Sequence, residues 1–163
     1  MSSGRLQREH GAPAASFVIA ARDAEATVAQ AVESALAQTV ADIEVVVVDD
    51  GSMDGTPAVL ASIEDDRLVV LRNDEPAGLA AALNRGLDAA RGRFVARLDA
   101  DDVALPHRLA RQLEEMRRRH VAVLGTGVLE IDDAGNPGVL HTSPEGPAGV
   151  RWRTLFGSAF FHP

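Results

Sequence analysis

Short apolar runs alternate along this chain with longer segments in which apolar residues recur every three or four positions. Residues 45–48 are four successive valines, which is typical of a strand buried on both faces of a parallel sheet. The apolar runs predict strands over 16–21, 43–48, 68–71, 94–98 and 121–124. Because predicted helices separate these strands, the order indicates an α/β fold with a doubly wound, mainly parallel sheet and right-handed crossovers.

The helical segments carry their own start and stop signals. Residues 24–38 have the apolar spacing of an amphipathic helix. Thr56 followed by Pro57 predicts an N-cap and a first helical residue, opening a helix through about residue 63. Gly92 is predicted to close the helix over 79–90 with a left-handed turn. A further helix is expected from Pro106, with Leu109, Leu113 and Met116 on its buried side.

Three parts follow from this pattern. Residues 1–14 form a polar segment that we expect to be mobile, residues 15–127 form the α/β domain, and residues 128–163 show a weaker pattern. Within the last part, residues 133–136 resemble a turn between two short strands.

Composition narrows the function classes. The chain has 163 residues, no cysteine and a net charge of −8, which argues against disulfides, zinc-thiolate sites and a general nucleic-acid surface. No apolar stretch reaches the roughly 18 residues that a membrane helix needs, and residues 1–14 lack the apolar block of a signal peptide. We therefore expect a cytoplasmic protein.

Two of the predicted strands end in carboxylates. Asp49 and Asp50 follow the valine strand, and Asp99, Asp101 and Asp102 follow the strand over 94–98. Ligands of open α/β sheets bind at the carboxyl ends of the strands, so both clusters are candidates for one site. Clustered carboxylates repel one another, and a bound Mg²⁺ or Mn²⁺ lowers that cost. Because Mg²⁺ takes few protein carboxylates and completes its shell with water and phosphate oxygens, the pattern favours a metal-chelated diphosphate.

These residues resemble a known family. VVVVDDGSMDGT at 45–56, followed by GLAAALNRGLDAARGRFVARLDADD at 78–102, resembles the N-terminal half of family 2 glycosyltransferases. The resemblance runs over 16–127, includes Ser34 and Gln38, and resumes at FFHP, residues 160–163. It implies the Rossmann-like GT-A fold, with 15–127 as the domain that binds a nucleotide sugar and 128–163 as the start of an acceptor-side region. We expect the rest of the acceptor half to be lacking.

The resemblance also implies residue roles. Asp50 corresponds to the aspartate that bonds the nucleotide base, Asp101 to the direct ligand of Mg²⁺ or Mn²⁺, and Asp99 to a residue near ribose and metal. The implied nucleotide-binding residues are Ala20, Ala21, Asp23, Asp49, Asp50, Gly78, Asn84, Asp99 and Ala100. His162 is implied on the diphosphate and acceptor side.

Two departures from the family pattern concern the donor contacts. Residues 20–23 read Ala-Ala-Arg-Asp where the family usually has Pro-x-Tyr-Asn. Gly78 stands where some members carry an arginine that binds the diphosphate. The side-chain contacts that the family makes at these positions are therefore not carried over, although the positions themselves are still expected to line the nucleotide site.

The implied activity is metal-dependent transfer of a sugar, with inversion, from a nucleoside-diphosphate sugar to an acceptor hydroxyl. A UDP-sugar is favoured as donor, and the acceptor is a saccharide or a lipid-linked saccharide, which would bring the protein to a membrane surface. The family places its catalytic base beyond the segment that matches FFHP, so the catalytic residue stays unknown. Glu130, Asp132 and Asp133 qualify by residue type but lie in the expected hairpin. Self-association is expected if the acceptor half is absent.

Two alternatives stay open at this point. One is a sugar-nucleotide-binding fragment without turnover. The other is a response-regulator receiver domain, in which Asp99 would be the phosphorylated residue. A receiver needs a lysine after its fifth strand, and this chain contains no lysine.

Overall fold

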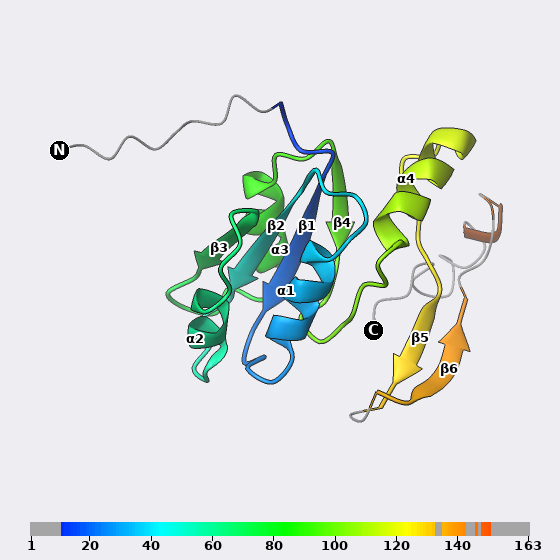
Figure 1. Ribbon diagram of the computed structural model, residues 1–163. Helices are drawn as coiled ribbons and strands as arrows, with labels where there is room; N and C mark the ends of the chain where they lie inside the picture. Colours follow the sequence, from blue (N-terminus) through cyan, green and yellow to red (C-terminus); the bar gives the residue numbers. More distant parts are fainter. Residues whose placement is uncertain (1–10, 133–134, 143–145, 147, 151–163) are drawn as a thin grey trace. The chain divides into compact units, whose positions relative to one another are not determined.

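The computed structural model describes residues 11–132, 135–142, 146 and 148–150 (Figure 1). The chain divides into two compact units, Met1–Ala110 and Arg111–Pro163. The first unit contains a four-stranded parallel sheet in the order β3-β2-β1-β4. Its strands are β1 (Ala15–Ala21), β2 (Ile43–Asp49), β3 (Leu68–Arg72) and β4 (Phe94–Arg97). The expected doubly wound parallel sheet is confirmed.

The core lies along the two central strands. All seven residues of β2 are buried, and Val45, Val46, Val47 and Val48 are each 0% exposed. Val18 of β1 pairs with Val46 of β2 on one side and with Arg97 of β4 on the other. Burying each valine side chain is worth about 1.5–3 kcal/mol, so this pair of strands supplies much of the stability of the unit.

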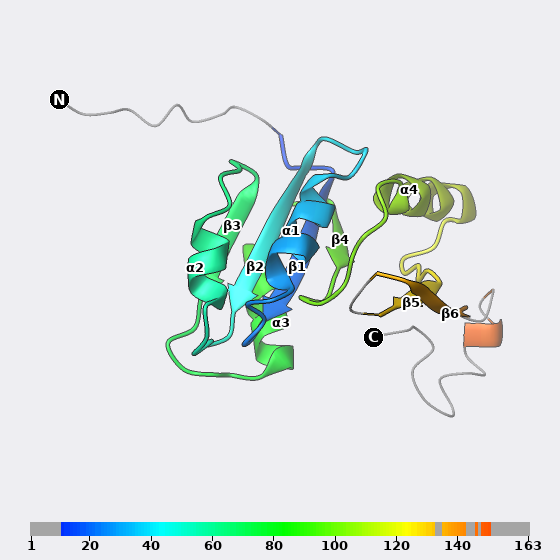
Figure 2. The same cartoon turned by 60° about the horizontal axis from the view of Figure 1, so that its bottom comes forward.

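Helices cover both faces of this sheet (Figures 1 and 2). Helices α1 (Val28–Leu36) and α2 (Thr56–Ala61) lie on one face, and α3 (Leu79–Ala89) lies on the other. The chain moves outward from β1 to β3 and then crosses back to β4. Since each crossover is right-handed, this reversal places α3 on the opposite face.

The starts of the first two helices differ from the prediction. Helix α1 begins at Val28, not at residue 24. Two of the residues before it bond to another loop: the Ala24 N–H donates to Thr56 Oγ1 at 2.8 Å and the Glu25 N–H to Asp54 Oδ2 at 3.0 Å. Thr56 is the first residue of α2 and not its N-cap. Its hydroxyl is used instead in donating to Asp54 Oδ1 at 2.6 Å.

Gly92 is needed for a reason other than the one predicted. Helix α3 ends at Ala89, Ala90 is extended, and Gly92 does not adopt a left-handed conformation. Its N–H donates to Ser16 Oγ at 2.8 Å, and a Cβ at this position would lie 2.4 Å from the Ser16 backbone nitrogen. Only glycine therefore lets the loop before β4 approach β1 so closely.

The second unit contains a hairpin. Strands β5 (Val128–Ile131) and β6 (Pro137–His141) pair antiparallel, and Gly135 N–H donates to the Asp132 carbonyl at 2.8 Å. The two short strands predicted on either side of residues 133–136 are confirmed, while Asp133 and Ala134 lie outside the described residues. Helix α4 (Arg108–Arg119) precedes the hairpin, starting two residues later than expected.

The strand predicted over 121–124 is wrong. These residues form no ladder with any strand in the part of the chain that the structure describes. A four-residue apolar run has no periodicity that separates a strand from a loop, so the pairing partner decides. None of the described helices is long and apolar enough to cross a membrane.

Candidate functional site

The carboxyl ends of three neighbouring strands bring the two acidic clusters to one edge of the sheet. Ala21 at the end of β1 pairs with Asp49 at the end of β2, and Asp50 N–H donates to the Ala21 carbonyl at 2.8 Å. On the other side of β1, Leu98 N–H donates to the Val18 carbonyl at 3.2 Å, so Asp99 follows at the same edge. Ala20 and Ala21 therefore lie between the clusters, as the strand order requires.

Asp49 is buried, and both of its carboxylate oxygens contact other groups of the protein. Its side chain is 1% exposed, its Oδ1 accepts the Ser52 N–H at 3.0 Å, and its Oδ2 lies 3.1 Å from Arg72 Nη1. Arg72 also donates to the Ser52 carbonyl at 3.1 Å. This carboxylate thus shapes the turn after β2 and binds the end of β3.

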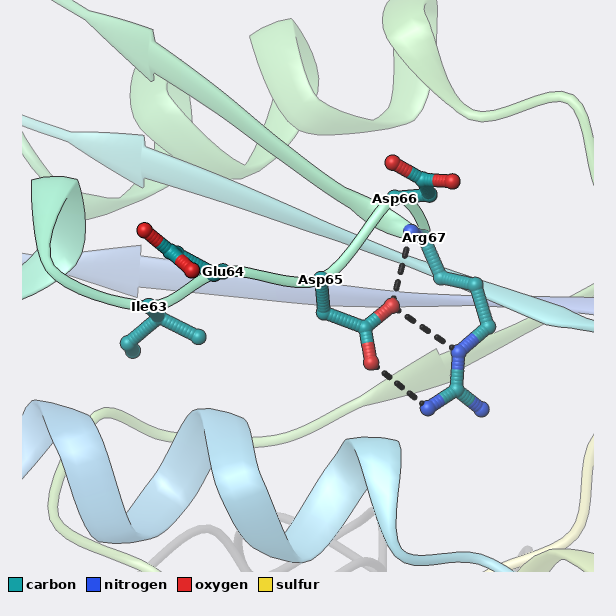
Figure 3. Close-up of a pocket in the computed structure, with 5 residues that line it drawn as sticks. All are labelled: Ile63, Glu64, Asp65, Asp66 and Arg67. Carbon is teal, nitrogen blue, oxygen red and sulfur yellow. Dashed lines mark hydrogen bonds and ion pairs between the residues drawn. The ribbon is translucent and has the colours of Figure 1, made fainter.

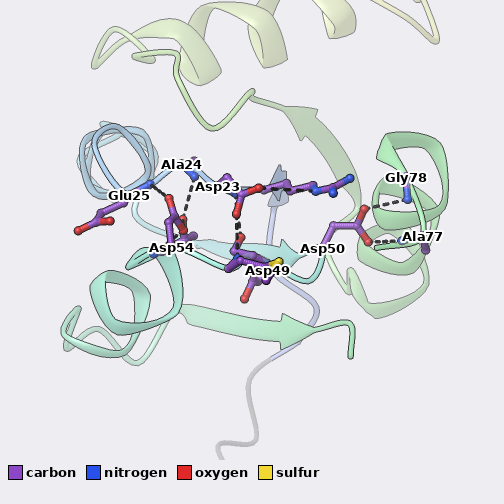
Figure 4. A network of polar contacts seen from close by, with 12 residues as sticks. Asp23, Ala24, Glu25, Asp49, Asp50, Asp54, Ala77 and Gly78 are labelled. Atoms are coloured by element: carbon purple, nitrogen blue, oxygen red, sulfur yellow. Dashed lines mark hydrogen bonds and ion pairs between the residues drawn. The ribbon is translucent and has the colours of Figure 1, made fainter. Parts of the chain in front are cut away.

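Asp50 points from the end of β2 toward the start of α3 (Figure 4). It is 3% exposed and accepts hydrogen bonds from the N–H groups of Ala77 and Gly78, both at 2.8 Å, and from Asn73 Nδ2 at 2.5 Å. The Ala77 N–H is the largest of the influences that hold the pKa of Asp50 below its usual value, despite its burial. A carboxylate accepts about four hydrogen bonds, so roughly one acceptor position remains.

Gly78 is shaped by this contact. It precedes α3 with a φ of 91°, which L-residues with a side chain rarely adopt. That conformation turns its N–H toward Asp50 Oδ2. An ionised Asp50 also lies favourably at the positive end of the α3 dipole. The structure therefore brings two of the predicted nucleotide-binding residues, Asp50 and Gly78, into direct contact.

Asp23 connects the loop after β1 with the loop after β2 (Figure 4). Its φ is 49°, its N–H donates to Ser52 Oγ at 3.0 Å, and its Oδ1 accepts the Met53 N–H at 2.8 Å. The neighbouring Arg22 contributes positive charge that also lowers the pKa of Asp50. The residues that replace the family's Pro-x-Tyr-Asn thus place an arginine beside the buried carboxylate.

The loop after β4 holds three carboxylates in different surroundings. Asp99 is 17% exposed and accepts from Arg97 Nη2 at 2.7 Å and Nε at 3.1 Å. Asp101 is exposed to solvent, whereas Asp102 is half-buried. Burial, together with the charges of Asp99 and Asp101, raises the pKa of Asp102. Burial is the largest of these causes, and the two neighbouring negative charges add to it.

Two arginines, Arg97 and Arg108, lie near these carboxylates. Arg108 donates from Nη2 to the Arg97 carbonyl at 2.7 Å and lies over the Phe17 ring, 5.9 Å from its centroid. Burial lowers the pKa of Arg108, and the charges of Asp102 and Asp99 partly oppose that effect. Part of the negative charge of the loop is therefore compensated by the protein itself.

The donor set fits a hard divalent cation that takes most of its ligands from elsewhere. Asp99 and Asp101 offer only oxygen donors, which Mg²⁺ and Mn²⁺ prefer. Among the described residues, no group of three or more His, Asp or Glu side chains gathers as a metal site. A cation held by Asp99 and Asp101 would complete its shell with water and phosphate oxygens, which is the usual pattern for Mg²⁺.

Of the remaining predicted residues, one lies on α3, one lies within the acidic loop after β4 and one is not described. Asn84 is exposed on α3, six residues beyond Gly78, or about 9 Å along the helix axis. Ala100 is buried in the loop after β4. His162 falls outside the described residues.

Sequence reasoning missed Asn73 and Arg97, the side chains that bond Asp50 and Asp99. Asn73 directly follows β3, so the rule that points to carboxyl strand ends could have found it. Arg97 lies inside β4, where the sequence offers no such signal.

A surface pocket is lined by residues 63–67 (Figure 3). It precedes β3 and thus lies at the amino end of that strand, opposite the acidic clusters. Arg67 donates to Asp65 Oδ2 at 2.8 Å and Oδ1 at 3.0 Å, which accounts for these charges as the closure of a turn. This pocket is therefore not the candidate site.

Comparisons with known proteins agree with the geometry. The family model described as Glycosyl transferase family 2 matches residues 16–162. Succinoglycan biosynthesis protein ExoO of Rhizobium meliloti is 43% identical over 122 residues, covering 74% of this chain and 35% of that protein. The glucosyltransferase WfaP of Escherichia coli, named for UDP-Glc and a GlcNAc-diphosphoundecaprenol, is 34% identical over 80% of this chain and 52% of its own length.

Solved structures also align with this chain. Staphylococcus aureus TarS 1-349 in complex with UDP-GlcNAc aligns with a TM-score of 0.67 and 25% identity, over 76% of this chain and 37% of that one. The mannosyltransferase PcManGT of Pyrobaculum calidifontis, in complex with GDP-Man and Mn²⁺, aligns with a TM-score of 0.59 and 27% identity, over 71% and 34% of the two chains.

This chain therefore spans about a third to a half of the length of these relatives. The receiver-domain alternative is wrong, because the family match covers nearly all of the chain and a full strand and helix precede the acidic strand. The GT-A fold is confirmed. The chain belongs to Glycosyl transferase family 2.

Proposed function

We propose that this chain carries the donor site of a glycosyltransferase and binds a nucleoside-diphosphate sugar together with Mg²⁺ or Mn²⁺. The observation that carries the proposal is that two acidic loops flank the end of β1 at the carboxyl edge of one parallel sheet. One loop carries Asp50, which accepts hydrogen bonds from the N–H groups of Ala77 and Gly78. The other loop exposes Asp101 to solvent. Such an edge is where ligands of open α/β sheets bind.

The relatives support this choice of ligand. The TarS structures contain UDP-GlcNAc or UDP, and the PcManGT structure contains GDP-Man and Mn²⁺. WfaP is named for UDP-Glc as donor and a lipid-linked GlcNAc diphosphate as acceptor. A UDP-sugar donor and a saccharide or lipid-linked saccharide acceptor are therefore our proposal for this chain. A lipid-linked acceptor would place the protein at the cytoplasmic face of a membrane.

The residues take distinct roles in this proposal. Asp50 offers its remaining acceptor position to the base, while Asp99 and Asp101 would hold the cation. A bound cation supplies positive charge that stabilises the departing nucleoside diphosphate. Gly78 lacks a side chain at the start of α3, so the backbone there can approach the ligand closely.

The proposed reaction is an inverting displacement. A bond forms between the acceptor oxygen and the anomeric carbon while the bond from that carbon to the diphosphate oxygen breaks, and the acceptor proton passes to a general base. Among the described residues, Glu130 lies 2.7 Å from His141 Nε2 and Asp132 accepts the Asn136 N–H at 2.8 Å. These contacts support hairpin roles for Glu130 and Asp132, and we assign no base.

Calorimetric titration with UDP, GDP and dTDP, each with and without Mn²⁺, tests the donor site. We expect Mn²⁺ to tighten the binding of at least UDP. The proposal fails if no nucleotide binds more tightly with the metal. Release of nucleoside diphosphate from sugar nucleotides, measured with and without acceptors, separates transfer from binding without turnover.

A further inference from the structure

The loop that carries Asp99, Asp101 and Asp102 has little structure of its own. Between the end of β4 and the start of α4, its internal backbone hydrogen bonds are Asp102 N–H to the Asp99 carbonyl at 3.2 Å and Arg108 N–H to the Leu105 carbonyl at 2.9 Å. Such a segment is held in one conformation only if other elements bond to it. The position of its carboxylates is thus decided elsewhere.

Gln38, which follows α1, supplies most of this support. The residue is 6% exposed, and its Nε2 donates to the Leu105 carbonyl at 2.9 Å and lies 3.4 Å from the Ala104 carbonyl oxygen. Its Oε1 accepts the Leu109 N–H at 3.0 Å. A single buried amide therefore bonds both the loop, at Ala104 and Leu105, and the first turn of α4, at Leu109.

Ser34, one turn earlier in α1, adds a second contact. Its Oγ accepts the Ala104 N–H at 3.0 Å and donates to the Ala31 carbonyl at 2.8 Å. Ala104 is thus bonded through its N–H to Ser34 and through its carbonyl to Gln38. Because Ala104 is two residues beyond Asp102, at most about 7 Å along the chain, a shift at Ala104 moves the carboxylates directly.

We propose that Gln38 and Ser34 are positioning residues for the cation and diphosphate, acting through the loop without touching the ligand. This inference rests on the proposed donor site. Mutation of a group that orients metal ligands typically lowers metal affinity 10–100-fold. A buried amide that only stabilised the fold would change the free energy of unfolding and leave the affinity of the folded protein unchanged.

Four variants separate the two roles. Gln38→Met keeps the length of the side chain and removes its hydrogen bonds. Ser34→Ala removes the hydroxyl, and Ser34→Thr restores it. Val32→Ala, a fully buried position of the same helix with no hydrogen bond to the loop, is the control for lost stability alone.

The measurements are calorimetric affinity for UDP in the presence of Mn²⁺, well below the unfolding temperature, and the thermal midpoint. We expect Gln38→Met to weaken binding by about tenfold. Ser34→Ala should weaken binding less, Ser34→Thr should bind as the parent does, and Val32→Ala should keep the parent affinity despite its lower midpoint. If Gln38→Met does not fold, the Ser34 pair decides by the same criterion.

Hydrogen exchange without ligand gives a second readout. Gln38→Met should speed exchange of the amides of residues 99–105, and Val32→Ala should not. Equal affinity and equal exchange in Gln38→Met and Val32→Ala would overturn the positioning role alone. A parent protein that does not bind UDP more tightly with Mn²⁺ would overturn the donor site and this inference together.

Discussion

The carboxylates at the edge of the sheet differ in what they have left to offer a ligand. Asp49 and Asp50 are 1% and 3% exposed and already bond to backbone N–H groups. Asp101 is exposed. Of these three residues, Asp49 and Asp50 hold the fold, whereas the carboxylate of Asp101 is open to solvent.

Asp101→Asn tests this division. The variant removes a full charge from the cation's surroundings, so we expect at least about a tenfold loss of Mn²⁺-dependent UDP affinity with an unchanged thermal midpoint. Asp50→Asn should instead lower the midpoint, because its carboxylate satisfies donors of the β3–α3 loop. Calorimetry and thermal melts measure both, with the exposed Asp88→Asn of α3 as the control. A larger loss of Mn²⁺-dependent affinity for Asp50→Asn than for Asp101→Asn would mean that the roles are reversed.

Arg97 would compete with the proposed cation for Asp99, because it already pairs with that carboxylate. The two side chains are 31% and 17% exposed and form an ion pair at 2.7 Å. Arg97→Gln should therefore tighten the binding of Mn²⁺ alone, by roughly fivefold or about 1 kcal/mol, the scale of a partly screened pair. Paramagnetic resonance of free Mn²⁺ measures this affinity. Weaker Mn²⁺ binding in the variant would mean that Arg97 orients Asp99 for the cation.

At the scale of elements, the amino ends of the strands are fastened by one buried carboxylate. Glu44 of β2 accepts from Ser16 Oγ of β1 at 2.6 Å and from the N–H and guanidinium of Arg91, at 2.6 to 2.9 Å. Burial raises the pKa of Glu44, but these hydrogen bonds outweigh burial and the net pKa lies below its usual value. The network ties β1, β2 and the loop before β4 at the end opposite the candidate site.

Glu44→Gln should lower the free energy of unfolding at pH 7 by about 2 kcal/mol, the value of hydrogen bonds to a charged group. A carboxyl with a depressed folded pKa contributes stability above its unfolded pKa, near pH 4.3, and loses it as the pH falls through the folded pKa. The difference between parent and variant should therefore shrink below pH 4.3. Urea unfolding followed by circular dichroism at pH 7 and pH 3 measures it. A difference that stays constant with pH would exclude the ionised network as its source.

At the scale of the molecule, the two ends of the parallel sheet have separate tasks. The carboxyl end carries the acidic loops, and the amino end carries the Glu44 network and the turn closed by Asp65 and Arg67. Support for the acidic loop after β4 comes from Ser34 of α1 and from Gln38, which follows that helix. The candidate site thus depends on contacts between segments about 70 residues apart in the sequence, as in the 71-residue separation of Gln38 and Leu109.

Ligand binding should protect one end of the sheet selectively. UDP with Mn²⁺ should slow hydrogen exchange of residues 50–54 and 99–102, because the ligand stabilises the state that binds it. The turn at 65–67, at the amino end of β3, should exchange by local opening at an unchanged rate. Exchange followed by mass spectrometry, with UDP alone as the control, measures both. Protection confined to 65–67 would locate the ligand in the pocket of Figure 3 instead.

The alternation of strands and helices, and the position of the carboxylates at strand ends, could be predicted from the amino-acid sequence. Hydrophobic periodicity is a local property of the chain. The valines of 45–48 therefore predict a buried strand that ends in aspartates, without any knowledge of its neighbours. The family resemblance in the same residues also identified the fold class correctly. Strand pairing cannot be predicted from such a local pattern. The strand expected over 121–124 is wrong because none of the strands that the structure describes forms a ladder with it.

Which carboxylates remain available to a ligand, and which groups hold the others, depends on contacts that form only in the folded chain. Asp50 is enclosed by Asn73, Ala77 and Gly78, which lie 23 to 28 residues away in the sequence. Glycine is required at position 92 because the chain there lies close to Ser16, 76 residues away in the sequence. Hydrogen bonds and close packing act only between groups that the fold brings together. The partners of a residue therefore cannot be predicted from the local sequence around it.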